Sequence, residues 1–536
     1  MKFIQGHNRQ QTHLFPVSLD ASIDPDNEVR IIDLFVDSLD IHQFGFKMDF
    51  IDNGRPAYHP ADMLKLFIYG YLNKIRSSRD LEKECKRNIE VIWLMKSLAP
   101  DHNTISNFRR DNPLAIKKVF RETVRIAKHF NLIGGKLIAG DSTKLRAQNS
   151  KKNNFNIKKI ELHVNYIDNK IEQYNKELEN ADEDKRKLIV NEIEKQSARK
   201  VKYNKLQKEL EDTGEVQIST SDPDSRQLIT RNNITEVAYN VQTTVDAKNY
   251  IPIDYKVTNE NDSKALGNMA RRAKSILQKN DFTLLYDKGY HTGSELKTAQ
   301  QLGIETIVAI PAVSSSSMAP DPAYNVSEFI FDETTNTYRC PQNNILITNG
   351  NWYKKTRSSK KRKRGTTILV QHYKTSACKT CPVINLCTKN TRGRGRVIER
   401  SEYSPYIEIN RKNVNEKEHL YKRRQAIVEH PYGIIKRQWG FSYIMTKKGM
   451  KRASADVGLI FVAYNLRRLF SILGKDVLKS YLGKLLLFFY TYLASIKAFS
   501  ASLLKNLLFS PLHSFNFQIS SNRLYLHQNR RINEGY

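Results

Sequence analysis

The strongest constraint on the fold is a run of alternating strand and helix patterns between residues 235 and 312. Two β-branched and aromatic runs, TEVAYNVQTTV and YIPIDYKVT, flank a short DAKN turn, as expected for an antiparallel hairpin. A helical pattern follows at Lys264–Lys279. Next come a strand pattern that ends in Asp287, a helix at 293–303 and a strand at 305–312. This order predicts an α/β fold with a mixed sheet.

Three acidic residues stand in settings that indicate metal-ion chemistry. Asp141 in LIAGDSTKLRA and Asp287 in TLLYDKGYHTG each end a short apolar run, so both are expected at the C-terminal ends of strands, where such sheets usually place ligands. Glu429 lies in a helical stretch rich in Arg and Lys. Three such carboxylates can hold two divalent cations, and Mg²⁺ suits a sparse carboxylate site. The alternative is that the two Asp residues are ordinary turn formers.

The charge balance favours a polyphosphate partner. The chain has 87 Lys and Arg residues against 56 Asp and Glu, a net charge of +31. Such a surplus promotes binding to nucleic acid through counterion release. A ribosome-associated or membrane-surface protein could show the same balance.

The first 130 residues carry the pattern of several short helices joined by tight turns. Cys85 is expected to be a packed core thiol in one of them. Arg109 and Arg110, in PDHNTISNFRRDN, are expected to be exposed and to contact DNA, as in a helix-turn-helix-like unit. A plain helical bundle with a basic face fits the pattern equally well.

Two insertions interrupt the central region. From Ile160 to Leu178 apolar residues step by three and four, a heptad seam, and a second helical pattern runs to about Glu211. These patterns predict an antiparallel helical hairpin that serves as a structural arm.

The second insertion is basic and holds four of the five cysteines, in TYRCPQN and SACKTCPVINLC. A Cys-x2-Cys pair lets two thiolates from one turn reach the same zinc ion. The predicted ligands of a structural, zinc-ribbon-like site are Cys340, Cys378, Cys381 and Cys387. The alternative is four ordinary reduced cysteines.

Cationic and aromatic side chains crowd the helical stretch that contains Glu429. The candidates for DNA contacts are Tyr421, Arg424, Lys436 and Arg437. Pro431 should kink or restart this helix. Without Asp141 and Asp287, a solvated basic helix face would be the better interpretation.

We expect a cytoplasmic, nucleoid-associated protein that has no membrane partner. The first 20 residues lack an apolar core of signal length, and the most apolar stretch, Leu485–Ser495, is too short to span a bilayer. Without an export signal, a disulfide framework is not expected.

Taken together, these segments resemble a DDE-type transposase of a bacterial insertion sequence. The resemblance rests on YHPADMLKLFIYGYLNKIRSSRDLEKEC, PDHNTISNFRRDN, GDSTKLRA, YDKGY, the C-x2-C-P-x4-C cluster and YKRRQAIVEHPYGIIK with AYNLRR downstream. It implies an N-terminal helical transposase domain, a ribonuclease H-like core and a cysteine-rich insertion before the catalytic Glu. One departure is that four residues separate Arg424 from Glu429, where the family's Tyr-Arg-Glu-Lys signature commonly has three.

The resemblance further implies that Asp141, Asp287 and Glu429 form a catalytic triad that binds two Mg²⁺ (or Mn²⁺) ions. A metal-activated water would cut the transposon end, and the freed 3′-OH would attack target DNA. The partners would be the two double-stranded DNAs and a second copy of the chain in a synaptic complex. The competing classes are a non-catalytic DNA-binding protein derived from a transposase and a metal-dependent nuclease.

The expected division of the chain follows from these patterns. The N-terminal domain occupies 1–130, and the catalytic core is split over three segments. The core segments are 131–155, 216–315 and 410–475, the hairpin is 156–215, the cysteine insertion is 316–409, and a helical tail is 476–536.

Overall fold

The computed structural model describes residues 18–48, 56–230, 234–313, 318–357, 366–390, 395–488 and 491. Most of the predicted tail at 476–536, and the KKRKR run at 360–364, lie outside these residues. The predicted mixed α/β fold with an N-terminal helical region is confirmed.

The N-terminal region is entirely helical among its described residues. The helices are α1 (Glu28–Asp37), α2 (Ile41–Phe44), α3 (Pro60–Leu72), α4 (Ser78–Arg87), α5 (Ile89–Leu94), α6 (His102–Asp111) and α7 (Pro113–His129). Asn, Asp, Ser and His side chains cap most of their N-termini, for example Asp101 on α6, whose carboxylate accepts from two backbone N–H groups. Cys85 is buried in this region as predicted.

The central sheet is mixed. Its strands are β1 (Leu137–Arg146), β4 (Arg226–Ile229), β5 (Thr235–Asp246), β6 (Ile251–Thr258), β7 (Thr283–Tyr286) and β8 (Glu305–Val308). The order is β4-β5-β1-β7-β8, and β6 also pairs with β5. The pairs β6–β5 and β5–β1 are antiparallel, whereas β1–β7 and β7–β8 are parallel.

Helices cover both faces of this sheet. On one face, Ile427 and Val428 of α14 (Glu418–Tyr432) pack on Ala139 and Leu285, and α13 (Ser404–Glu416) contacts β8. The other face carries α7, α10 (Leu266–Leu277), α11 (Gly293–Gln301) and α15 (Met450–Leu473). Because side chains alternate along a strand, Asp141 shares the α14 face with Ala139.

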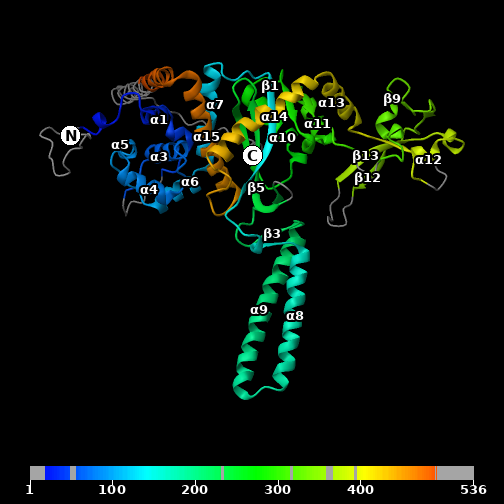
Figure 1. The fold of residues 1–536 in the computed structure, drawn as a ribbon, viewed down its shortest axis with the longest axis horizontal. Coiled ribbons are helices and arrows are strands. Elements are labelled where there is room, and N and C mark those ends of the chain that lie inside the picture. Colours follow the sequence, from blue (N-terminus) through cyan, green and yellow to red (C-terminus); the bar gives the residue numbers. More distant parts are fainter. Residues whose placement is uncertain are drawn as a thin grey trace, which may run out of the picture.

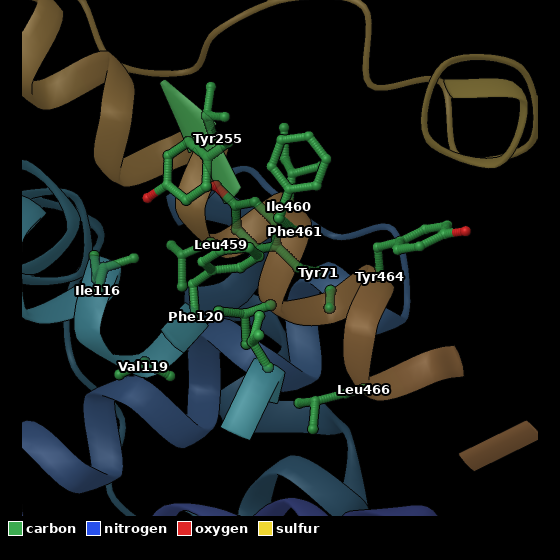
Figure 2. Close-up of a cluster of buried hydrophobic side chains, with 14 of the residues drawn as sticks. Tyr71, Ile116, Val119, Phe120, Tyr255, Leu459, Ile460, Phe461, Tyr464 and Leu466 are labelled. Atoms are coloured by element: carbon green, nitrogen blue, oxygen red, sulfur yellow. The ribbon is translucent and has the colours of Figure 1, made fainter. Parts of the chain in front are cut away.

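A continuous apolar core joins the N-terminal helices to the sheet. Figure 2 shows Phe120 of α7, Tyr255 of β6 and Phe461 of α15 grouped together. The Phe120 and Tyr255 rings meet edge to face at 5.0 Å, and the Tyr255 and Phe461 rings stack at 5.5 Å. The helical region is therefore packed against the sheet rather than tethered to it.

The two insertions project from the sheet in different directions (Figure 1). Helices α8 (Ile157–Glu179) and α9 (Glu183–Thr213) lie side by side as a long arm. The cysteine region holds two small sheets, β9 (Ile330–Asp332) with β10 (Thr337–Arg339) and β11 (Ile345–Leu346), and β12 (Tyr353–Arg357) with β13 (Thr366–Tyr373) and β14 (Ile398–Ser401). Within the described ranges, no single helix is long and apolar enough to cross a membrane. Only the sharply bent pair of α15 with Lys475–Phe488 reaches that length and composition together.

Of the two predicted effects of Pro431, a kink or a restart of its helix, the restart is not observed. Helix α14 continues through Pro431 to Tyr432, and the wider π-helical turns of Gly433–Gln438 follow it directly. A π-helical segment is a common way to accommodate a disturbed ladder of backbone hydrogen bonds. Lys436 lies within this segment and donates to Thr143 of β1, so the segment affects how this part of the chain meets the sheet.

Gly140 allows the close approach of Tyr286 beneath the Asp141 backbone. A Cβ atom at position 140 would lie 1.9 Å from Tyr286 Cζ, and the Tyr286 ring is fully buried. We expect Gly140→Ala to lower the free energy of unfolding by about 1–3 kcal/mol or more, because the buried ring must move. Urea unfolding measures this. Gly483→Ala, where no atom lies within 4 Å, is the control and should be neutral or stabilising. Equal stability of the two variants would contradict this packing.

Candidate active site

The prediction that Asp141 ends a strand is wrong, because β1 continues past it to Arg146. Asp141 lies near the middle of β1, on the face that α14 covers. Its carboxylate accepts the Ser142 backbone N–H at 2.7 Å, and 26% of the side chain is exposed. Burial raises the pKa of Asp141 to about 6, and the nearby Arg424 guanidinium opposes this rise. A nearby cation favours the ionised form of such a carboxylate, because it opposes the effect of burial.

Asp287 follows β7, the parallel neighbour of β1, and lies beside Asp141. The Gly289 backbone N–H donates to its carboxylate at 2.8 Å. One guanidinium nitrogen of Arg424 is 3.2 Å from Asp141 Oδ2 and 4.0 Å from Asp287 Oδ2. The structure therefore brings together two of the three predicted acidic residues, and both face one cationic group.

Helix α14 and the π-helical segment supply the other groups beside Asp141. Tyr432 donates to the Asp141 carbonyl oxygen at 3.3 Å, and Lys436 Nζ donates to Thr143 Oγ1 at 3.0 Å. Tyr421 is half-buried near the two aspartates, and burial raises the pKa of its phenol. Arg437 is exposed. Three of the four predicted DNA-contacting residues of this stretch, Tyr421, Arg424 and Lys436, thus lie beside the aspartates or against the strand that carries Asp141.

Glu429 is not brought to the aspartate pair in this structure. Its side chain is exposed and accepts a hydrogen bond from Gln425 Nε2 at 3.0 Å. In a helix of 3.6 residues per turn, a spacing of five residues turns Glu429 roughly 140° away from Arg424. With the three intervening residues common in the resembled family, Arg and Glu would instead share one helix face. In this chain the residue separated from Glu429 by three residues is Gln425.

Asp262, which the sequence did not single out, lies at the same site. It accepts from Asn240 Nδ2 and Gln242 Nε2, both at 2.7 Å, and pairs with Lys144 Nζ at 3.3 Å. Its charge contributes to the raised pKa of Asp141. The only sequence signal is a cluster of polar residues, NENDSK, directly after an apolar strand, which is equally typical of a surface loop.

The prediction that Arg109 is exposed to DNA is wrong. Arg109 is 3% exposed, donates to the Tyr71 hydroxyl at 2.9 Å and lies 3.6 Å from the buried Asp456 carboxylate. It shares its helix face with Ile105, one turn earlier, and that face packs inward. Arg110 is partly exposed, and its guanidinium is bound by Asp111.

The four cysteines of the second insertion line one small cavity of about 20 Å³. Cys340 follows β10, and Cys378, Cys381 and Cys387 come from the loop and short helices after β13. Burial raises the pKa of the Cys387 thiol. All four thiols border this cavity, but within the described residues they do not form a group placed to hold a metal ion.

In the part of the chain that the structure describes, neither of the two predicted metal sites, the acidic triad and the four cysteines, forms a close group of ligands. Among the described residues, no group of three or more His, Cys, Asp or Glu side chains is placed to hold a metal ion. Asp141 and Asp287 do converge on one cation, so this pair fits the donor chemistry of a divalent ion.

Comparison with known proteins identifies two separate parts of the chain. Residues 17–111 match a family model described as "Transposase domain (DUF772)", and residues 339–470 match one described as "Transposase DDE domain". The second match includes Glu429, whereas Asp141 and Asp287 lie between the two matches. The resemblance to a DDE-type transposase is confirmed by these models.

One solved structure, the piggyBac transposase synaptic complex with hairpin DNA, is similar at 9% identity and a TM-score of 0.26, covering 91% of this chain and 80% of that chain. A TM-score this low carries no argument about fold or mechanism. No curated protein matches the chain.

Proposed function

We propose that this chain, a DDE-type transposase by its two family matches, cuts transposon ends and joins them to target DNA by phosphoryl transfer. The observation that supports this most directly is the convergence of Asp141 and Asp287 on Arg424. Two carboxylates from neighbouring strands, facing one cation at a basic surface, suit the binding of a cation and a phosphate together.

In this proposal Asp141 and Asp287 hold divalent metal ions, Mg²⁺ or Mn²⁺. A metal held by these two carboxylates would supply a nucleophile at neutral pH and would stabilise charge on the attacking and leaving oxygens. Arg424 neutralises the two carboxylates in the free protein and is released to a DNA phosphate when they are otherwise occupied. A guanidinium suits that exchange because it binds carboxylate and phosphate with the same fork of donors.

Glu429 remains the proposed third carboxylate, although it now faces solvent beside Gln425. Lys436 is proposed to hold a phosphate rather than to act as a base, since its ammonium already reaches the strand that carries Asp141. Tyr421 and Arg437 are proposed to contact the DNA backbone. The DNA partners are the transposon ends and the target, and two copies of the chain form the synaptic complex.

The outward position of Glu429 favours one competing proposal, a DNA-binding protein that does not cut. A single experiment separates the two. Purified protein is incubated with Mg²⁺ and a supercoiled plasmid that carries the DNA flanking its own gene. Excised and joined products support transposition. Cut but never joined strands support a nuclease, and binding without any cut strand supports the non-catalytic protein.

We also propose that the four-cysteine lobe binds one structural zinc, because all four thiols line the same cavity. Metal analysis of purified protein should find about one zinc per chain. The variant Cys381→Ser should lose it, whereas Cys85→Ser, in a thiol buried among the N-terminal helices, should keep it. Folded wild-type protein without zinc would remove this proposal and leave the proposed transposition untouched.

A further inference from the structure

A wide basic cleft lies on the sheet face opposite Asp141. Helices α7 and α10 form its walls and β6 contributes to its floor, enclosing about 1160 Å³. Six cationic side chains line it, with Glu122 as the one acidic lining residue: Arg121, Arg125, Lys128, Lys256, Arg271 and Arg272.

The buried Asp254 organises the floor of this cleft. Its fully buried carboxylate lies 3.0 Å from both Lys117 Nζ and Arg121 Nη2, and 2.5 Å from Arg272 Nε. Burial alone would raise the pKa of Asp254, but these three cations outweigh that effect and hold it well below its usual range. Arg121 and Arg272 are thereby fixed in place, while 33% and 30% of their side chains remain exposed.

The lining cations outnumber the acids that form ion pairs with them. Six cations line the cleft, and two carboxylates, those of Glu122 and Asp254, pair with them, which leaves a surplus of four positive charges. Glu260 also attracts Lys256. Lys256 donates to the neutral Asn268 side chain at 3.1 Å. Arg271 and Ser275, one helical turn apart on α10, are exposed toward the cleft. Such an arrangement of cations held by Asp254 and exposed cations on the cleft wall is complementary to a row of phosphates.

We propose that this cleft binds the phosphate backbone of a DNA duplex segment other than the one whose strand is cut at Asp141 and Asp287. The sheet separates the two surfaces, because α10 and α14 cover opposite faces. A duplex carries one charge per roughly 1.7 Å of its axis, so a groove of anchored cations gains affinity by releasing counterions. The inference rests on the proposed function only in taking DNA as the ligand.

The test compares two double variants with the same residue changes. Arg271→Glu with Ser275→Glu places negative charge in the cleft, and Arg186→Glu with Ser197→Glu does the same on exposed positions of the α9 arm. All four positions are on exposed helix surfaces, so both proteins should fold. Circular dichroism confirms this. Binding of a labelled duplex of arbitrary sequence is then measured by anisotropy over a salt series, without divalent cations.

We expect the cleft variant to bind about tenfold more weakly than the arm variant, and its salt slope to fall by about one. Binding by the cleft variant within twofold of the arm variant would overturn the proposal. Plasmid cutting by wild type is followed in parallel. Weaker binding by the cleft variant together with no plasmid cutting by wild type would contradict the proposed transposition and leave the cleft proposal standing. Normal cutting by wild type together with unchanged binding by the cleft variant would contradict the cleft proposal and leave the proposed transposition standing.

Discussion

Asp287→Ala is expected to abolish strand cleavage while leaving DNA binding intact. The change removes one of the two carboxylates that face Arg424, so only Asp141 of that pair remains. Losing an outer-shell partner of a metal site typically costs 10–100-fold, and losing a ligand should cost more than about 100-fold in cleavage rate. Binding should persist, because it depends on cations, and removing a negative charge does not weaken it.

The matched control for this experiment is Asp281→Ala. Asp281 lies six residues earlier, is 76% exposed and faces only Lys279 at 3.7 Å. The change removes the same charge at the opposite end of β7, away from the aspartate pair. Cutting at the wild-type rate by Asp287→Ala would end the assignment of this residue. Loss of cutting in both variants would mean that the assay reports general damage.

The pairing of Asp141 with Asp287 could be predicted because it depends on local patterns. Each residue follows an apolar run, and the parallel register of β1 with β7 brings the residues after those runs side by side. The strand end predicted at Asp141 is not there, because β1 continues to Arg146. The mixed sheet could be predicted for the same reason, because apolar residues repeat every two residues in a strand and every 3.6 residues in a helix. Asp262 could not be found in this way, because its role depends on Asn240 and Gln242 from another strand.

The errors come from orientation rather than from secondary structure. Arg109 and Arg110 look alike as a pair, but the helical period puts Arg109 on the inward face with Ile105. For Glu429 the decisive quantity was its spacing from Arg424, because one extra residue rotates a side chain by roughly 100° about the helix. That departure was visible in the sequence. Its consequence depends on which face of α14 meets the sheet, and tertiary packing decides this.

The buried Asp456 locks the N-terminal helices onto α15. It lies in α15, is 0% exposed, and accepts from Arg76 Nη2 at 2.6 Å and from the Tyr71 hydroxyl. Arg109 lies 3.6 Å away, and the Arg76 guanidinium also covers the Phe441 ring at 4.5 Å. Two guanidinium groups from the N-terminal region therefore share one carboxylate from a helix more than 300 residues later in the chain.

Asp456→Ala should lower the free energy of unfolding by about 3–5 kcal/mol, because it leaves two buried cations without a counter-ion. Urea unfolding followed by circular dichroism measures the loss, and Asp476→Ala, at an exposed position shortly after α15, should change little. Burial alone would raise the pKa of Asp456, but Arg76 and Arg109 outweigh it and hold the pKa below its usual value. The contribution is therefore complete above the unfolded-state pKa of about 3.9 and is lost as pH falls through the lower folded value. The difference between wild type and Asp456→Ala should shrink in acid, and a gap that widens below about pH 4 would contradict an ionised Asp456 in the folded protein.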